Sequence, residues 1–593
     1  MDNLCSNLGT TDRHPRPDFA CPAWESLDGE WEFAVDDGDQ GISGRWYEKG
    51  SFPLRINVPY VYQCGRSGIA EEERRRRHDV LWYRRELAVG RELAGKRILL
   101  HFGAVDFDAE LWVNGAPAGR HAGGYSPFCF DITEHVVFGG ENAVVLRVRD
   151  DAFSREQPRG KQSWMPGNFG CWYTGYAGIW QSVWMEALDP AHIESLSVRP
   201  DFSGRAAELE LGFSGAGENL EWSVEVSARG RKIASLRGRA LQKRASVRVD
   251  LENGAFEQGA LFWSPEDPAL YDLKAELLRD GRPVDERRSY FGLREICAED
   301  GRLLLNRAPV YQKLVLYQGY YPDGLVTSTD DEEIAADLKM IRRMGFNGLR
   351  VHQKIESSRF LYWCDRLGLL VWEEMPSFYS FTQRSMRTLL EEWQAILERD
   401  RNHPCIVTWV LFNESWGLPN LSVSAREQAF ARAAVELTRA MDGTRPVVDN
   451  DGWEHTDATD LVTIHDYGDG ARHFESVYGD RERLLCDEPS SGYPKYLFGR
   501  GQEYRGQPVL ITEYGGIAFS ESDGWGYNEK VGSKEEFLRR FRELTGAIRS
   551  IPYVCGSCYT QFTDVEQEQN GLLTLDRVPK VDPEEIRKIN GGR

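Results

Sequence analysis

The spacing of hydrophobic residues divides this chain of 593 residues into two parts with different patterns, which meet near residue 297. Before that point, short segments such as 220–226 and 246–251 alternate apolar and polar residues with period two, which is typical of half-buried strands. After it, apolar β-branched runs alternate with amphipathic segments, which is typical of parallel strands joined by helices. The pattern therefore predicts a β-rich first half and an α/β second half.

The β-rich half itself divides into two domains. In residues 20–187, the segment 111–115 ends on Asn-Gly, a strong hairpin signal, and 143–148 and 179–185 form further strands. No convincing amphipathic helix interrupts them, so we predict a jelly-roll sandwich, a kind of β-sandwich. Residues 188–296 continue as short strands whose length and spacing fit an immunoglobulin-like β-sandwich.

The second half, residues 297–593, predicts a closed (β/α)8 barrel of the TIM type. The helix expected over 332–344 places Ile334, Leu338 and Ile341 on one face, and a second helix is expected over 359–367. Eight strands are expected, at 310–315, 348–352, 369–372, 405–411, 446–449, 461–464, 508–512 and 555–562. Eight such repeats in this length are typical of that barrel.

Polar residues recur where these apolar runs end. They are Arg350, His352, Glu373, Glu374, Asn413, Glu414, Asp449, Asn450, His465, Asp466, Tyr467, Glu513, Gln561 and Asp564. Because the carboxyl ends of barrel strands meet at one mouth, where barrel enzymes hold their active sites, we expect these side chains to converge there.

Two of them, Glu414 and Glu513, suggest a specific chemistry. Each follows a buried apolar strand, where a carboxylate has no packing role. Paired carboxylates cleave glycosidic bonds: one protonates the leaving oxygen, and in retaining enzymes the other attacks the anomeric carbon from roughly 5–5.5 Å away. Barrel-rim ion pairing is the alternative interpretation of the two residues.

Further residues are candidates for substrate binding. Asn413 could hydrogen-bond the 2-hydroxyl, and Tyr467 could orient the nucleophile. The remaining candidates are His352, Glu374, His465, Gln561 and Asp564. Each histidine could equally be a packed residue that bonds a backbone carbonyl. Glu373 and Glu374 point to opposite faces of one strand, so only one, Glu374, is expected to line the pocket.

At this point the chain resembles glycoside hydrolase family 2, the β-galactosidase, β-glucuronidase and β-mannosidase group, over nearly its whole length. The matching segments are 82–85, 112–115, 123–128 and 178–180 in the first domain, 263–271 and 291–294 in the second, and 402–414 and 511–515 in the barrel. The resemblance implies that Glu414 is the acid/base and Glu513 the nucleophile, in agreement with their placement at strand ends.

Two departures from the family pattern bear on the expected metal and on the expected sugar. Residues 316–319 read Leu-Tyr-Gln-Gly where many members have an Asn-Arg-His-Glu type sequence that helps bind magnesium, so we predict no catalytic metal and no other cofactor. Asn570 is followed by Gly571 and Leu572, so the lysine of the Asn-x-Lys pair that grips a uronate in β-glucuronidases is missing. A neutral, galactose-type sugar is therefore favoured.

Composition limits the possible partners. The net charge of −21 argues against nucleic acid or an anionic membrane surface. No apolar run approaches a membrane span, no secretion signal is evident, and the 11 scattered cysteines indicate a reduced, cytoplasmic protein. A homo-oligomer is compatible with the sequence, and segment 468–507, which lacks periodicity, could be a lid or a subunit contact.

The sequence thus predicts a retaining, exo-acting β-glycosidase, most like a β-galactosidase, with an oligosaccharide or glycoside as substrate. Within the enzyme class the alternatives are a β-glucuronidase, a β-mannosidase or a furanose- or arabinose-specific glycosidase. The alternative from another class is a carbohydrate-binding protein without catalysis, which the presence of both carboxylates disfavours.

Overall fold

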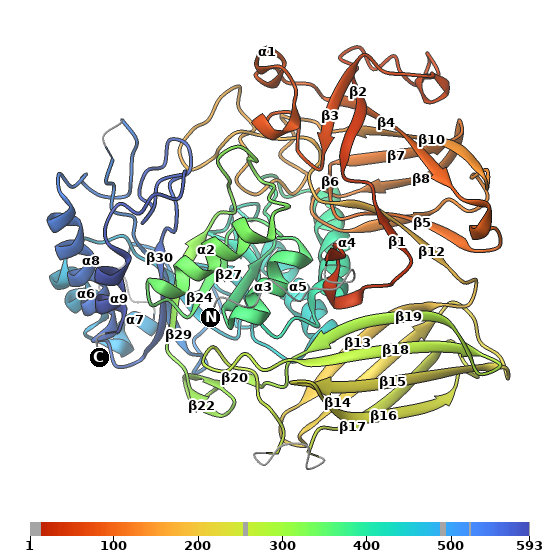
Figure 1. The fold of residues 1–593 in the computed structure, drawn as a ribbon. Helices are drawn as coiled ribbons and strands as arrows, with labels where there is room; N and C mark the ends of the chain where they lie inside the picture. Colours follow the sequence, from red (N-terminus) through yellow and green to blue (C-terminus); the bar gives the residue numbers. More distant parts are fainter. Residues whose placement is uncertain (1–12, 253–258, 487–493, 521–522, 592–593) are drawn as a thin grey trace.

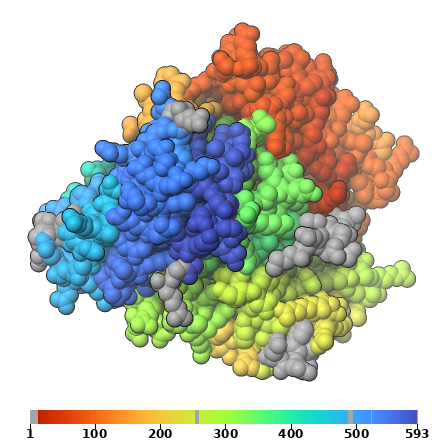
Figure 2. Space-filling model, turned by 60° about the vertical axis from the view of Figure 1, so that its left-hand side comes forward, coloured from red at the N-terminus to blue at the C-terminus, as the bar shows by residue number. Residues whose placement is uncertain are grey.

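The computed structural model describes residues 13–252, 259–486, 494–520 and 523–591. Two β-sandwiches flank a barrel: the first lies above and the second below, and both contact the barrel on the same side of the molecule (Figure 1). The space-filling view shows the three parts in continuous contact (Figure 2).

The first sandwich combines a six-stranded sheet, in the order β3-β2-β4-β10-β7-β8, with a four-stranded sheet, β1-β12-β5-β9, and a short β11-β6 pair. The predicted hairpin is β7–β8, where Asn114 and Gly115 adopt φ of 53° and 80°, the left-handed turn that these residues tolerate. The strands are β1 (Trp24–Ser26), β2 (Gly29–Val35), β3 (Leu54–Val58), β4 (Val80–Val89), β5 (Arg97–Phe102), β6 (Val105–Asp106), β7 (Asp108–Val113), β8 (Ala116–Ala122), β9 (Phe128–Asp131), β10 (Gly140–Arg149), β11 (Gly178–Ile179) and β12 (Val183–Leu188).

The second sandwich packs a three-stranded sheet, β13-β14-β17, against a four-stranded one, β16-β15-β18-β19. In β15, alternate residues from Leu220 to Ala228 are buried, which realises the period-two pattern of the sequence. The strands are β13 (Ile193–Asp201), β14 (Ala206–Phe213), β15 (Leu220–Ala228), β16 (Arg231–Arg239), β17 (Arg244–Asp250), β18 (Tyr271–Arg279) and β19 (Arg282–Phe291). A small sheet of β20 (Ile296–Glu299), β21 (Arg302–Leu305) and β22 (Ala308–Pro309) leads into the barrel.

Eight parallel strands form the barrel, in the order β27-β26-β25-β24-β23-β30-β29-β28. They are β23 (Gln312–Tyr317), β24 (Gly348–Val351), β25 (Leu370–Glu374), β26 (Ile406–Asn413), β27 (Val447–Asp451), β28 (Val462–His465), β29 (Val509–Gly515) and β30 (Val554–Thr560). The two end strands meet through backbone hydrogen bonds from Asp460 N to Val447 O, 2.9 Å, and from His465 N to Gly452 O, 3.4 Å. The sheet is therefore closed.

Helices cover the outside of the barrel, and several begin at a side chain that caps their free backbone amides. Asp330, Ser357, Thr382, Ser424 and Ser533 each accept a hydrogen bond from the first turn of their helix. The barrel helices are α2 (Asp331–Arg343), α3 (Ser358–Leu367), α4 (Gln383–Asp400), α5 (Ala425–Met441), α6 (Ala471–Tyr478), α7 (Arg481–Leu485), α8 (Lys534–Arg549) and α9 (Pro583–Gly591), whereas the short α1 (Glu71–Arg74) belongs to the first sandwich. Within the described residues, no helix has the length and apolar character needed to cross a bilayer.

The predicted fold class is confirmed, with shifts of a few residues at element ends. The first barrel strand begins at Gln312 rather than 310, because Val310 still bonds Leu303 in the preceding small sheet. Segment 468–507, which showed no periodicity, contains α6 and α7, and its residues 487–493 lie outside the described part of the chain. Whether it is a lid or a subunit contact stays open as predicted.

Candidate active site

The two candidate glutamates lie close together at the carboxyl ends of their strands. Glu414 follows β26 and its side chain is 20% exposed, whereas Glu513 lies within β29 and is buried. One carboxylate oxygen of each, together with a ring nitrogen of His465, lies within 4.8 Å of the others. This short separation is close to that of retaining glycosidases and leaves no room for the water that inverting enzymes place between their carboxylates.

A sharp turn presents Glu414 to the mouth. Glu414 and Ser415 have φ of 50° and 60°, in the left-handed region that non-glycine residues rarely adopt and that is common at functional sites. Strand β27 holds the turn: Glu414 N donates to Asp451 O at 2.9 Å, and Ser415 N donates to Asn450 Oδ1 at 2.9 Å. The acid/base candidate is thus fixed by a neighbouring strand rather than by its own loop.

Arg350, which is completely buried in β24, organises the carboxylates. Its guanidinium donates to Glu513 Oε1 at 2.8 Å and to Asn413 Oδ1 at 2.7 Å, and it pairs with Asp451 Oδ2 at 2.7 Å and Glu374 Oε2 at 2.6 Å. Buried carboxylates need such a counterion, since desolvation otherwise favours their neutral form. Arg350 therefore bonds side chains from four other strands of the barrel.

His465, the last residue of β28, joins the two catalytic candidates. Its Nδ1 lies 2.8 Å from Glu414 Oε1, and its Nε2 lies 3.1 Å from Asp451 Oδ2 and 3.5 Å from Glu513 Oε1. Burial by itself lowers the pKa of His465, but Glu513 and Asp451 raise it to about 10. The imidazole is therefore protonated at neutral pH, and both ring nitrogens donate to carboxyl oxygens.

These charges keep Glu513 ionised. Burial alone raises the pKa of Glu513, yet the positive charges of His465 and Arg350 outweigh it and lower this pKa to about 2. The Tyr467 hydroxyl donates to Glu513 Oε2 and is itself stacked on Tyr527, with ring centroids 3.6 Å apart. An ionised and oriented carboxylate is what nucleophilic attack requires.

In the side-chain amide of Asn413, the oxygen is hydrogen-bonded and the nitrogen is not. Its Oδ1 accepts from Arg350, while its buried Nδ2 has no hydrogen-bond partner among the described residues. Buried amide donors are almost always paired, so an unpaired one beside two catalytic carboxylates suits a substrate oxygen. The predicted contact of Asn413 with a sugar hydroxyl is compatible with this geometry.

The adjacent Glu373 and Glu374 separate as strand alternation requires. Glu374 faces the barrel interior, where it bonds Arg350 and pairs with His352 Nδ1 at 3.2 Å. Glu373 faces α4, and burial together with Asp400 raises its pKa well above the usual range. The two candidates Glu374 and His352 therefore belong to the cluster around Arg350, and their contacts with substrate stay predictions.

Gln561 and Asp564 lie beyond β30 and have different surroundings. Gln561 donates to Asn570 Oδ1 at 2.7 Å, and its own Oε1 is buried without a partner among the described residues. Asp564 accepts from Lys580 Nζ at 2.6 Å and from Gly571 N at 2.9 Å, which holds the loop after β30 together. Within the described residues, neither Gln561 nor Asp564 bonds Glu414 or Glu513, so their substrate contacts stay predictions.

Glu414, His465 and Glu513 together could be taken for metal ligands, because their oxygen and nitrogen atoms cluster closely. The donor set does not fit a cation well, since a protonated imidazole has no free lone pair and Arg350 already neutralises Glu513. The absence of a catalytic metal nevertheless stays a prediction.

The first sandwich contributes to the same mouth. The loop between β10 and β11 crosses to the barrel (Figure 1), where Trp172 Nε1 donates to the Tyr379 hydroxyl at 2.7 Å and the Tyr173 hydroxyl donates to Glu568. Trp172 also contacts Trp416, two residues after Glu414, with ring centroids 5.2 Å apart. Asp451 and Trp416 are site residues that the sequence analysis missed. A buried aspartate that ends an apolar strand was the available signal for Asp451.

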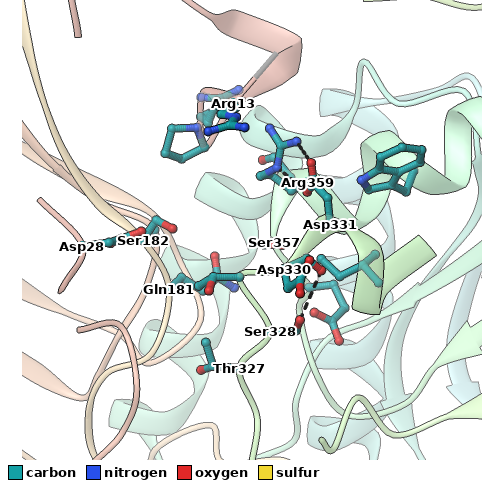
Figure 3. Close-up of a pocket in the computed structure, with 18 of the residues that line it drawn as sticks. Arg13, Asp28, Gln181, Ser182, Thr327, Ser328, Asp330, Asp331, Ser357 and Arg359 are labelled. Carbon is teal, nitrogen blue, oxygen red and sulfur yellow. Dashed lines mark hydrogen bonds and ion pairs between the residues drawn. The ribbon is translucent and has the colours of Figure 1, made fainter. Parts of the chain in front are cut away.

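A large cavity of about 1160 Å³ lies elsewhere, between the first sandwich and the outer rim of the barrel. Figure 3 shows Gln181 and Ser182 on one wall and Asp331 and Arg359 on the other. Neither catalytic candidate lines it. The chemistry is therefore located by the carboxylate geometry and not by cavity size.

Comparison with known proteins gives the family. Residues 24–187 match the sugar binding domain of glycosyl hydrolases family 2, residues 191–294 match a further family 2 domain, and residues 323–590 match the family's TIM barrel domain. The chain belongs to glycosyl hydrolase family 2. The predicted resemblance is confirmed, and the protein is a glycoside hydrolase.

Individual relatives differ in their sugar. A β-glucuronidase of Paenibacillus borealis is 25% identical over 94% of this chain and 95% of its own length. A β-galactosidase of Thermoanaerobacter pseudethanolicus is 28% identical over 62% of this chain, which spans about half (48%) of that protein. A solved β-glucuronidase from an uncultured Clostridium has a TM-score of 0.77 and 23% identity, and covers 96% of this chain and 98% of its own, a likeness that shows the fold.

We expect replacement of His465 by glutamine to move the acidic limb of the pH–kcat/KM profile to higher pH by about one to two units. The wild-type Glu513 pKa of about 2 depends on the positive His465 beside it, so loss of that charge favours the protonated carboxyl and inactivates the nucleophile earlier as pH falls. In the profile of an aryl glycoside between pH 3 and 9, the wild type should keep its kcat/KM down to pH 3, whereas the variant should lose it as pH approaches 3. His473→Gln, which removes a partner of Asp466 only, is the control. An unchanged acidic limb would show that His465 does not tune Glu513.

Proposed function

We propose that this family 2 hydrolase is a retaining, exo-acting β-glycosidase that releases a terminal neutral sugar of the galactose type. The observation that carries the mechanism is the carboxylate pair: oxygens of Glu414 and Glu513 within 4.8 Å, with Glu513 held ionised by Arg350 and His465. A carbohydrate-binding protein without catalysis would have no need for either feature.

The reaction follows from these positions. The Glu513 carboxylate attacks the anomeric carbon while the Glu414 carboxyl protonates the departing oxygen, so that a covalent glycosyl-enzyme forms and the aglycone leaves. Glu414, now ionised and within hydrogen-bond reach of His465, then accepts a proton from water, whose oxygen attacks the anomeric carbon and releases Glu513. Two inversions at one carbon restore the original β configuration.

The preference for a neutral glycone rests on the loop after β30. Leu572 occupies the position at which β-glucuronidases have a uronate-binding lysine, and it is completely buried. The neighbouring Asn570 is bonded to Gln561 and Glu568, and Lys580 is paired with Asp564. The loop thus offers no free cation to a sugar carboxylate, and the carboxylates around Arg350 would repel one.

A second candidate is a β-glucuronide, because the relatives with matching length, such as that of Paenibacillus borealis, are β-glucuronidases. It requires a cation outside the loop after β30. A β-mannoside or a furanose or arabinose glycoside has no observation in its favour here.

Hydrolysis of a panel of p-nitrophenyl glycosides tests the proposal. We expect kcat/KM for the β-galactoside to exceed that for the β-glucuronide roughly tenfold or more, since each tenfold step corresponds to about 1.4 kcal/mol, less than burying an unpaired carboxylate costs. The product anomer, followed by NMR, should be β before mutarotation. A preference for the glucuronide would replace the first candidate by the second, and an α product would contradict the retaining mechanism.

A further inference from the structure

Lys161 reaches the barrel on the loop that joins β10 to β11 of the first sandwich. The loop is anchored on both sides of this residue: Arg159 N and Gly160 N donate to Ser377 O at 3.0 and 3.2 Å, and Tyr173 N donates to Lys161 O at 2.8 Å. Ser377 follows barrel strand β25, so the backbone of Lys161 is fixed to the catalytic domain although it belongs to another one.

Gly160 makes this approach possible. It has a φ of 54°, and a Cβ atom placed on it would lie 2.2 Å from the carbonyl oxygen of Gln353, which follows β24. Any other residue would force the loop away from the barrel. The Gly-Lys step therefore carries a lysine into close contact with the barrel mouth.

The ammonium of Lys161 is enclosed by aromatic rings. The residue is only 5% exposed, and Nζ lies 5.0 Å from the ring centroid of Trp416, 5.5 Å from that of Tyr173 and 6.0 Å from that of Trp172. Within the described part of the chain, no carboxylate oxygen lies within 4.0 Å of it. The thiol of Cys171, a weak acceptor, is its hydrogen-bonding neighbour. Buried cations are normally paired with an anion, whereas the Lys161 ammonium lacks such a strong acceptor.

The surroundings of Lys161 connect it to the reacting groups. Trp416 is two residues beyond Glu414, and its backbone N donates to Asn413 O at 2.8 Å. On the other side, the Tyr173 hydroxyl donates to Glu568. Burial lowers the pKa of Lys161, but the nearby Cys171, Glu568 and Glu513 raise it above its ordinary value, so the side chain stays charged.

We propose that Lys161 is a glycone-recognition residue, which donates hydrogen bonds to sugar oxygens near Trp416 and Glu568. This inference rests on the proposed function and specifies how the site selects its sugar. Glu568 is the complementary acceptor: Tyr173 and Asn570 each donate to one of its oxygens, and both oxygens keep further lone pairs. A charged donor near a charged acceptor, with no net charge on the two together, matches adjacent hydroxyls of a neutral sugar.

A Lys161→Met variant tests the proposal on p-nitrophenyl β-D-galactoside and its monodeoxy analogues. We expect kcat/KM on the parent sugar to fall about tenfold to a hundredfold, the range for a lost hydrogen bond to a charged group. On the analogue that lacks the contacted hydroxyl, the same substitution should change kcat/KM less than about threefold, because the contact is already absent. Lys161→Arg should recover part of the loss.

The control is Lys49→Met. Lys49 also lies over an aromatic ring of the first sandwich, Trp46, but is exposed. The Lys49→Met substitution should leave kcat/KM unchanged on every substrate. A purely structural role of Lys161 would lower kcat/KM equally on the parent and on every deoxy analogue, and that result would overturn the proposal.

The activity of the wild type on the p-nitrophenyl glycosides separates the proposed neutral-glycone function from the proposed role of Lys161. If wild type prefers the glucuronide, the neutral-glycone function fails. The role of Lys161 then holds if Lys161→Met reduces activity on the glucuronide far more than on the glucoside, and it is overturned if both fall alike. If turnover is absent throughout, calorimetric titration with 1-deoxygalactonojirimycin decides: tenfold or greater weakening in Lys161→Met supports the role, and equal affinity or no binding overturns it.

Discussion

Replacement of Glu513 by alanine is expected to lower kcat by about 10⁴-fold or more on every glycoside that the enzyme cleaves, with little change in folding. The Glu513 carboxylate bonds both Arg350 and Tyr467, and the surrounding charges keep it ionised. Loss of the nucleophile removes the covalent step itself, not just a contact with the sugar.

Azide rescue with a 2,4-dinitrophenyl glycoside distinguishes nucleophile from acid/base. In Glu513→Ala, azide can enter the space left by the carboxylate and attack the anomeric carbon, which gives the α-glycosyl azide. In the matched variant Glu414→Ala, Glu513 still forms the glycosyl-enzyme, and azide replaces water in the second step to give the β-glycosyl azide. Interchanged products would reverse the assignment of the two glutamates.

Replacement of Arg350 by methionine is expected to destabilise the barrel by about 3–5 kcal/mol and to abolish most activity. The substitution leaves the buried carboxylates of Glu374, Asp451 and Glu513 without the cation that bonds all three. Scanning calorimetry suits this multidomain chain, because it can resolve the barrel transition from those of the sandwiches.

The loss in Arg350→Met should depend on pH. In the wild type, Arg350 helps to lower the pKa of Glu374 and Glu513, so its stabilisation is present above their ordinary values near 4.5 and is lost as pH falls through the lowered values. Without Arg350 these carboxyls protonate readily in the folded state, so the gap to wild type should narrow between pH 7 and pH 4. A gap that is constant with pH would mean that lost packing, not charge, is responsible.

Arg287→Met is a matched control. Arg287 is also buried and pairs with Glu186 at 2.8 Å, but this pair lies between the two sandwiches. We expect a loss of stability without any change in the pH dependence of kcat/KM for the molecules that remain folded.

The positions of the two glutamates that we propose as catalytic could be predicted because the relevant information is local in the sequence. An apolar run that ends on a glutamate specifies both a buried strand and a polar end, whatever surrounds it. Glu414 and Glu513 were found in this way, and Glu374 was correctly separated from Glu373 by strand alternation alone. Asp564 shows the limit: its place after the last strand predicts a substrate contact, but the sequence did not indicate its bonds to Lys580 and Gly571.

The sequence by itself determined the fold class, the order of the three domains and the identity of the two glutamates, because strand periodicity and strand ends are properties of short segments. Only the tertiary structure decided which charges surround those glutamates. Arg350 and His465 act on Glu513 across the closed barrel, and Lys161 arrives from another domain through a glycine that fits against Gln353. Electrostatic effects and hydrogen bonds depend on distance in space, and the folding of segments far apart in the chain sets that distance.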